Sequence, residues 1–114
     1  MSASGALKAV DRILNVGGDA DDVLRAVVAA LVERGGCAWA GIWFVEGEAL
    51  ELGPQAGAPD EARRLRVPIE FRGDRVGELG ADGTSEPALV ERVAVLISPY
   101  VLLGWDTGGE AWKP

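Results

Sequence analysis

The sequence contains no histidine and one cysteine, Cys37. The lack of histidine removes the commonest general base, the commonest metal ligand and the usual switch of charge near neutral pH. A single thiol cannot form an internal disulfide, and it leaves a zinc site with almost no ligands. No glycine-rich segment ends in the Lys-Ser or Lys-Thr pair of a phosphate-binding loop. We therefore expect no metal, no cofactor and none of the common catalytic sites.

Positive charge is also scarce, since the formal net charge is -7. This balance argues against non-specific binding to nucleic acid and against docking on an anionic membrane. The longest uncharged run, Val93 to Trp105, contains Pro99 and is too short to span a bilayer. The first four residues lack the charged and apolar regions of a signal peptide. We expect a cytoplasmic protein with no nucleic-acid or membrane partner.

Hydrophobic residues make up 48% of the chain and charged residues 25%, the balance of a domain with a packed core. Apolar residues spaced by three and four predict helices over residues 5–16, 20–34 and 86–103. Apolar runs bounded by turn residues predict strands over 37–45, 49–52, 64–72 and 76–81, with a loop over 53–60. Asp19 is expected to cap the second helix, and Pro99 to kink or end the last one.

Two helices, two hairpins and a final helix predict an α+β fold. The expected architecture is an antiparallel sheet with the N- and C-terminal helices packed on one face. Residues 1–104 are expected to form one domain. Residues 105–114, which include Trp105 and Trp112, are expected to form a C-terminal tail.

Trp39, Gly41 and Trp43 point to the same face of one predicted strand, because side chains alternate along a strand. Two large rings on either side of a glycine can leave a hollow for a flat or apolar ligand. Together with Leu52 and Gly53 on the neighbouring segment, these residues form the candidate ligand-binding site. The alternative is that both tryptophans belong to an ordinary core.

Five of the nine arginines lie between Arg63 and Arg75. Arg64, Arg66 and Arg72 are predicted to share the polar face of one strand, as a candidate anion site or a docking patch for an acidic partner. The alternative is a solvated edge strand whose charges prevent edge-to-edge pairing, with Glu70 and Glu78 as ionic partners.

The last helix carries no charge from Val93 to Leu103. One small sheet cannot cover every side of such a helix, and exposed apolar surface marks association, so a homodimer is expected. The candidate dimer interface comprises apolar residues of the first and last helices: Leu7, Val10, Leu14, Val93, Ile97, Tyr100 and Val101. The alternative is that the first helix and the two C-terminal tryptophans cover this surface within one chain.

The run Trp-Ala-Gly-Ile-Trp at 39–43, followed by Leu-Glu-Leu-Gly-Pro-Gln-Ala-Gly at 50–57, is similar to the first hairpin of GAF domains. Its motif is closest to the free methionine-(R)-sulfoxide reductase branch. Val-Pro-Ile at 67–69 and Val-Gly-Glu-Leu at 76–79 resemble the later GAF hairpin. The resemblance implies a GAF-like (profilin/PAS-like) architecture, a pocket on the sheet face opposite the terminal helices, and dimerisation through those helices.

The chain departs from the family in one respect. In GAF domains a long segment between the two motifs covers the pocket and, in the reductase branch, carries the catalytic cysteines. Here Gly57 and Val67 are only ten positions apart, and Cys37 lies before the first strand, outside any catalytic position that the resemblance assigns. We expect a shortened, non-enzymatic module for self-association and small-molecule sensing. The alternatives are a ligand-free scaffold and a degenerate reductase that depends on Cys37.

Overall fold

The computed structural model describes the backbone of residues 3–84 and 86–111, and the side chains of residues 5–84 and 86–102. Within these residues, three α-helices, one short 3-10 helix and four strands follow one another. In order they are α1 (Ala3–Val16), α2 (Ala20–Glu33), β1 (Trp39–Glu46), β2 (Ala49–Gly57), η1 (Glu61–Arg63), β3 (Arg64–Phe71), β4 (Asp74–Asp82) and α3 (Pro87–Ala111).

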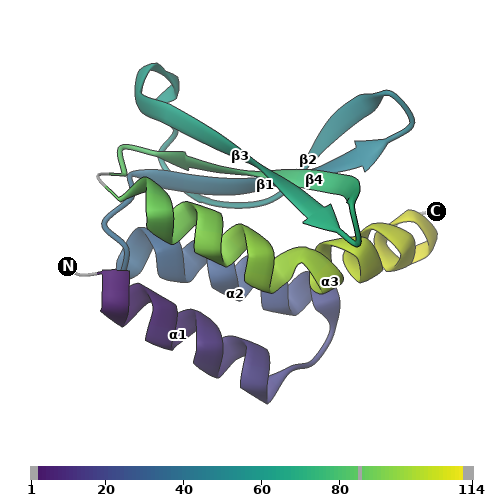
Figure 1. Cartoon of the computed structure of the whole chain (residues 1–114), viewed down its shortest axis with the longest axis horizontal. Helices are drawn as coiled ribbons and strands as arrows, with labels where there is room; N and C mark the ends of the chain where they lie inside the picture. The colour runs from purple at the N-terminus through teal and green to yellow at the C-terminus, as the bar shows by residue number, and fades with distance from the viewer. Residues whose placement is uncertain (1–2, 85, 112–114) are drawn as a thin grey trace.

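The four strands form one antiparallel sheet in the order β2-β1-β4-β3. Figure 1 shows three layers: the sheet, then α2 and α3 against one of its faces, then α1 beneath those two helices. In this view no α-helix of the described residues lies against the other face of the sheet. The predicted α+β class, with helices on one side of an antiparallel sheet, is confirmed.

The core lies between the sheet and the helices, as period-two alternation in the strands requires. Ala40, Ile42 and Phe44 of β1 belong to it, as do Leu79 and Ala81 of β4. Residues on the opposite side of the same strands face away from the helices. Alternation along β1 and β4 therefore decides which side chains remain for a functional site.

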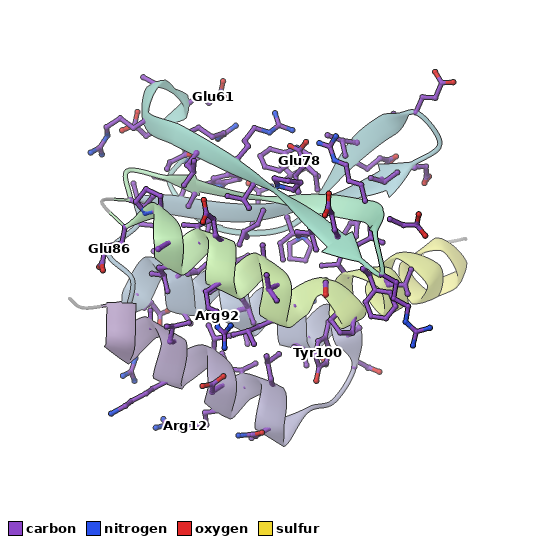
Figure 2. All side chains as sticks on the ribbon, in the orientation of Figure 1. Arg12, Glu61, Glu78, Glu86, Arg92 and Tyr100 are labelled. Atoms are coloured by element: carbon purple, nitrogen blue, oxygen red, sulfur yellow. The ribbon has the colours of Figure 1, made fainter. Side chains whose placement is uncertain are left out.

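The candidate dimer interface is largely used within the chain. Val10, Val93, Ile97 and Val101 are fully buried in the single protomer, so the prediction that they form an intermolecular surface is wrong. Leu7, Leu14 and Tyr100 are partly buried against the same core. The Tyr100 hydroxyl donates a hydrogen bond to the Leu14 carbonyl at 3.4 Å, which ties α3 to α1 (Figure 2). The first helix covers the last one, as the alternative proposed.

Helix α3 continues through Pro99 to Ala111, so the backbone of residues 105–111 is helical rather than a tail. Proline has no N–H, which removes the helical hydrogen bond to the carbonyl of Val95 four residues earlier. The Ser98 hydroxyl donates to that carbonyl at 3.0 Å and satisfies it. The side chains of Trp105 and Trp112 lie outside the described residues. Within the described part of the chain, no helix combines the length and apolarity needed to cross a bilayer.

Two local predictions also need correction. Asp19 occupies the N-cap position of α2 but its side chain makes no capping hydrogen bond, while Asp21 pairs with Arg25 at 3.0 Å. Strand β2 extends to Gly57, so most of the predicted loop over 53–60 is strand. A register shift between Gly41 and Trp43 accommodates this long strand.

Replacing Val10 by alanine tests whether α1 packs within the chain. Losing two buried carbons and leaving a cavity should lower the free energy of unfolding by about 2 kcal/mol. Urea titration at two protein concentrations measures it, and exposed Val16→Ala, the control, should change stability by less than about 0.5 kcal/mol. A destabilisation by Val10→Ala that depends on protein concentration would show that α1 packs between chains instead.

Candidate functional site

The sheet face away from the helices is organised in three cross-strand rows over β1, β4 and β3. The pairing register aligns one residue from each strand in every row. The rows are Trp39–Asp82–Arg64, Gly41–Gly80–Arg66 and Trp43–Glu78–Pro68. A row with two glycines therefore lies between two rows that each hold a tryptophan and a carboxylate. Figure 2 shows Glu78 on this side of the sheet.

Both indole rings lie over the glycine row. A Cβ added to Gly41 would overlap the six-membered ring of Trp39, and one added to Gly80 would come within 2.5 Å of the Trp43 ring. The two ring centroids are 5.7 Å apart at an interplanar angle of 59°. Trp39 is 1% exposed, and its Nε1 donates to the Gln55 side-chain oxygen at 3.0 Å. The hollow predicted above Gly41 is thus filled by Trp39 itself.

The other two candidate ligand-binding residues are not part of one pocket with the tryptophans. A Cβ on Gly53 would overlap the ring of Phe44, which belongs to the core, so Gly53 makes room for core packing. Leu52 lies opposite Trp43 in the β1–β2 pair and is 44% exposed. The structure brings together Trp39, Gly41 and Trp43, with Leu52 beside Trp43 on the edge strand and Gly53 against the core.

Two arginines of β3 stack on these rings. The Arg64 guanidinium carbon lies 4.3 Å from the Trp39 ring centroid, and that of Arg66 lies 4.2 Å from the Trp43 ring centroid. Arg64 also donates two hydrogen bonds to Asp82, at 2.8 and 2.9 Å. Arg66 donates one to Glu78 at 2.6 Å. Both arginines are already paired with carboxylates, which disfavours a free anion site.

Arg72 does not join this face. It lies after the end of β3, with a φ of 55°, and its guanidinium carbon is 5.3 Å from the Phe71 ring centroid. A register shift between Ile69 and Glu70 breaks the alternation on which the three-arginine patch depended. The prediction that Arg64, Arg66 and Arg72 share one strand face is therefore wrong for Arg72.

The Asp82 carboxylate holds the short β2–β3 connection against the sheet. It is fully buried, and besides Arg64 it accepts a hydrogen bond from the Asp60 backbone N–H at 2.6 Å. The Asp60 carboxylate in turn accepts one from Arg63 at 2.7 Å. Burial raises the pKa of Asp82. The hydrogen bonds from Arg64 and Asp60 and the charges of Arg64 and Arg63 outweigh burial, so its pKa lies below the ordinary value.

Sequence reasoning did not identify Asp82 or Gly80 as part of the site. The pattern that indicates them is the alternation Glu78, Gly80, Asp82 along β4, which places three non-apolar residues on the side opposite Leu79 and Ala81. Composition alone marked this segment as a return strand and a turn. Its partners could be assigned only from the register with β1 and β3.

The lone thiol is poorly suited to chemistry. Cys37 is buried immediately before β1, and burial raises its pKa above the ordinary value; the Asp82 charge also raises it, against a hydrogen bond with Thr84 that lowers it. A raised pKa keeps the sulfur protonated at neutral pH, and the thiolate is the nucleophilic form. Within the described residues, no three acidic or cysteine side chains gather to hold a metal ion.

Two surface hollows among the described residues are lined by residues other than the tryptophan pair. One of about 190 Å³ lies between Val45, Gly47, Arg75, Val76 and Leu102, where the two hairpin turns approach α3. Another of about 470 Å³ runs between α2 and the edge strand β2, from Asp21 and Ala29 to Gln55. Neither is lined by Trp39 or Trp43.

Solved structures with this fold include GAF domains and reductases. The GAF domain of a phosphoenolpyruvate-protein phosphotransferase from Coxiella burnetii superposes with a TM-score of 0.75 at 14% identity, covering 96% of this chain and 99% of that one. The GAF domain of the Acinetobacter phosphotransferase gives 0.74 at 13% identity, covering 95% and 98%. Free methionine-R-sulfoxide reductase from Neisseria meningitidis, solved with its substrate, gives 0.70 at 15% identity, covering 92% and 93%. No protein-family model and no curated protein sequence matches the chain.

Gly41→Ala tests the packing of the Trp39 indole ring against the backbone of Gly41. The added methyl group overlaps Trp39, so we expect a loss of about 1 to 3 kcal/mol in the free energy of unfolding. Trp39→Phe removes the ring atoms that would overlap, so the double variant should recover part of this loss. A double-mutant cycle from urea titrations measures the coupling. Strictly additive effects of the two substitutions would contradict the packing described above.

Asp82→Asn tests the buried carboxylate. Because folding lowers its pKa, Asp82 stabilises the fold above its unfolded-state pKa of about 3.9, and this stabilisation is lost as pH falls through the lower folded-state pKa. We expect the variant to be less stable by about 2 to 3 kcal/mol at pH 7, with the difference from wild type shrinking below about pH 4. Urea titrations across this range measure it, with exposed Glu48→Gln as control. A difference that stayed constant down to pH 2 would contradict the assignment.

Proposed function

We propose that this chain, which has the GAF fold, is a non-catalytic module that binds other macromolecules rather than transforming a small molecule. The observation that carries the proposal is the filled sheet face. Trp39 occupies the space above Gly41, and the guanidinium of Arg64 lies over its ring. A sealed face of this kind favours the ligand-free scaffold over the small-molecule sensor.

The short connection between β2 and β3 supports the same proposal. Only residues 58–63 separate Gly57 from Arg64, and they include the single turn of η1. The Ala58 N–H donates to the Ala38 carbonyl at 2.9 Å, and Asp60 is tied to Asp82. This connection lies against the sheet and has no length for a covering element above the tryptophans. A GAF-type ligand would have nothing to enclose it.

The state of Cys37 argues against the reductase alternative. A buried, protonated thiol is a poor nucleophile, and no second cysteine in the chain can resolve an oxidised sulfur. An unpaired thiol of this kind suits a reducing compartment, which supports the proposal of a cytoplasmic location.

A homodimer remains part of the proposal, on a changed surface. The four buried residues of the candidate interface are occupied by intrachain packing. Val95 on α3 is 64% exposed and remains available for contact with a second copy. Self-association would then add to the intrachain helical layer rather than replace it.

Free methionine-(R)-sulfoxide and a thiol reductant provide the test. We expect no reduction of the sulfoxide and no rise in Tm at saturating concentrations, because the sheet face is filled. Wild type and Cys37→Ser should behave alike, and Cys37 should react with a thiol reagent only as fast as the fold opens. Turnover that is lost in Cys37→Ser, or a saturable rise in Tm, would overturn the proposal.

A further inference from the structure

The two arginines that cover the tryptophans are held very differently. Arg64 has a side chain 15% exposed and makes two hydrogen bonds to the fully buried Asp82. Arg66 has a side chain 44% exposed and makes one described hydrogen bond, to Glu78. A half-exposed guanidinium is held only weakly by stacking on an aromatic ring. The Arg66 side chain can therefore move off the Trp43 ring at a small cost in free energy, whereas Arg64 cannot leave the Trp39 ring as easily.

When Arg66 moves away, the Glu78 carboxylate is not left without a cationic partner. Glu78 also pairs with Arg75 through its other carboxylate oxygen, so it keeps a cationic partner when Arg66 moves away. This matters because the Glu78 side chain is only 11% exposed, and a buried carboxylate without a partner is costly. One oxygen of Glu78 then becomes free to accept a new donor above Trp43.

The surface left behind has the parts of a receptor for a guanidinium. Trp43 is only half-buried and offers a ring face, with the Trp39 ring tilted beside it. Glu78 lies directly opposite Trp43 in the β1–β4 pair. Leu52 lies opposite Trp43 on the other neighbouring strand, β2. It adds exposed apolar surface for the methylene groups of an incoming side chain. The chain's own Arg66 shows that a guanidinium fits here.

We propose that the Trp43–Glu78 site binds an arginine side chain of a partner protein, and that Arg66 occupies this site until the partner displaces it. The proposal rests on the interaction role proposed above and names the chemistry of the partner. The formal net charge of -7 favours a cationic partner. A planar guanidinium stacks on an indole while donating to a carboxylate at the ring edge, which the compact ammonium of lysine does less well.

The probe is N-acetyl-arginine-N-methylamide, titrated into wild type, Arg66→Ala and Arg12→Ala. Arg12, on α1 at the far side of the molecule from Glu78, is the control that removes an equal charge (Figure 2). Binding is followed by the NMR shift of the Trp43 indole N–H, assigned with Trp43→Phe. We expect Arg66→Ala to bind about tenfold more tightly than wild type and Arg12→Ala. The lysine analogue should bind Arg66→Ala several-fold more weakly than the arginine probe.

Three results would overturn the inference. They are no saturable shift of Trp43 in folded Arg66→Ala, equal affinities of Arg66→Ala and Arg12→Ala, and equal binding of the arginine and lysine probes. If Arg66→Ala fails to fold, Arg66→Gln keeps most of the stem without the charge and takes its place. The readout needs no sulfoxide or thiol, so its failure leaves the proposed non-catalytic role standing. Sulfoxide turnover would instead remove that role.

Discussion

The packing of two indole rings over a row of glycines is the constraint on which the arrangement of the helix-free sheet face depends. Gly41 and Gly80 lie side by side in neighbouring strands, and together they leave space for the rings of Trp39 and Trp43. Any side chain at either glycine would push the rings away from the sheet. Because the rings lie over the glycine row, the arginines of β3 can stack on them. The carboxylates of β4 pair with these arginines. The rows of the sheet supply both.

Ionic groups cover this face in place of a chain segment. In GAF domains, as the resemblance implies, a long insertion covers the sheet between the two hairpins. Here the connection is short, and Asp82 fastens it to the sheet through the Asp60 N–H while also holding Arg64 above Trp39. The buried carboxylate of Asp82 thus holds the β2–β3 connection against the sheet and orients the Arg64 guanidinium over the Trp39 ring. The same face is rigid at Arg64 and exchangeable at Arg66, because the two arginines differ in exposure and in number of hydrogen bonds.

On the helical side, most of the described apolar surface of α3 that suggested a dimer is buried within one chain, and Val95 remains exposed. Val93 and Ile97 of α3 belong to the same buried core as Val10 of α1. Helix α3 continues through Pro99 because the Ser98 hydroxyl donates to the Val95 carbonyl, which Pro99 leaves without a backbone donor. The GAF neighbours share this fold at identities too low to carry function, so the role of the chain has to be argued from its own residues.

Local sequence pattern determined the three helices, the two hairpins and the sides of β1, because periodicity and turn residues act over a few neighbouring positions. It failed over residues 53–57, where glycine and proline indicated a loop but pairing with β1 imposed a strand. It also could not tell whether Trp39 borders a hollow or fills it. That depends on Gly80 and Arg64, which lie far along the chain and meet Trp39 only through the register of β4 and β3. Register is set by packing of the whole sheet on its helices, so only the tertiary structure decided the state of the site.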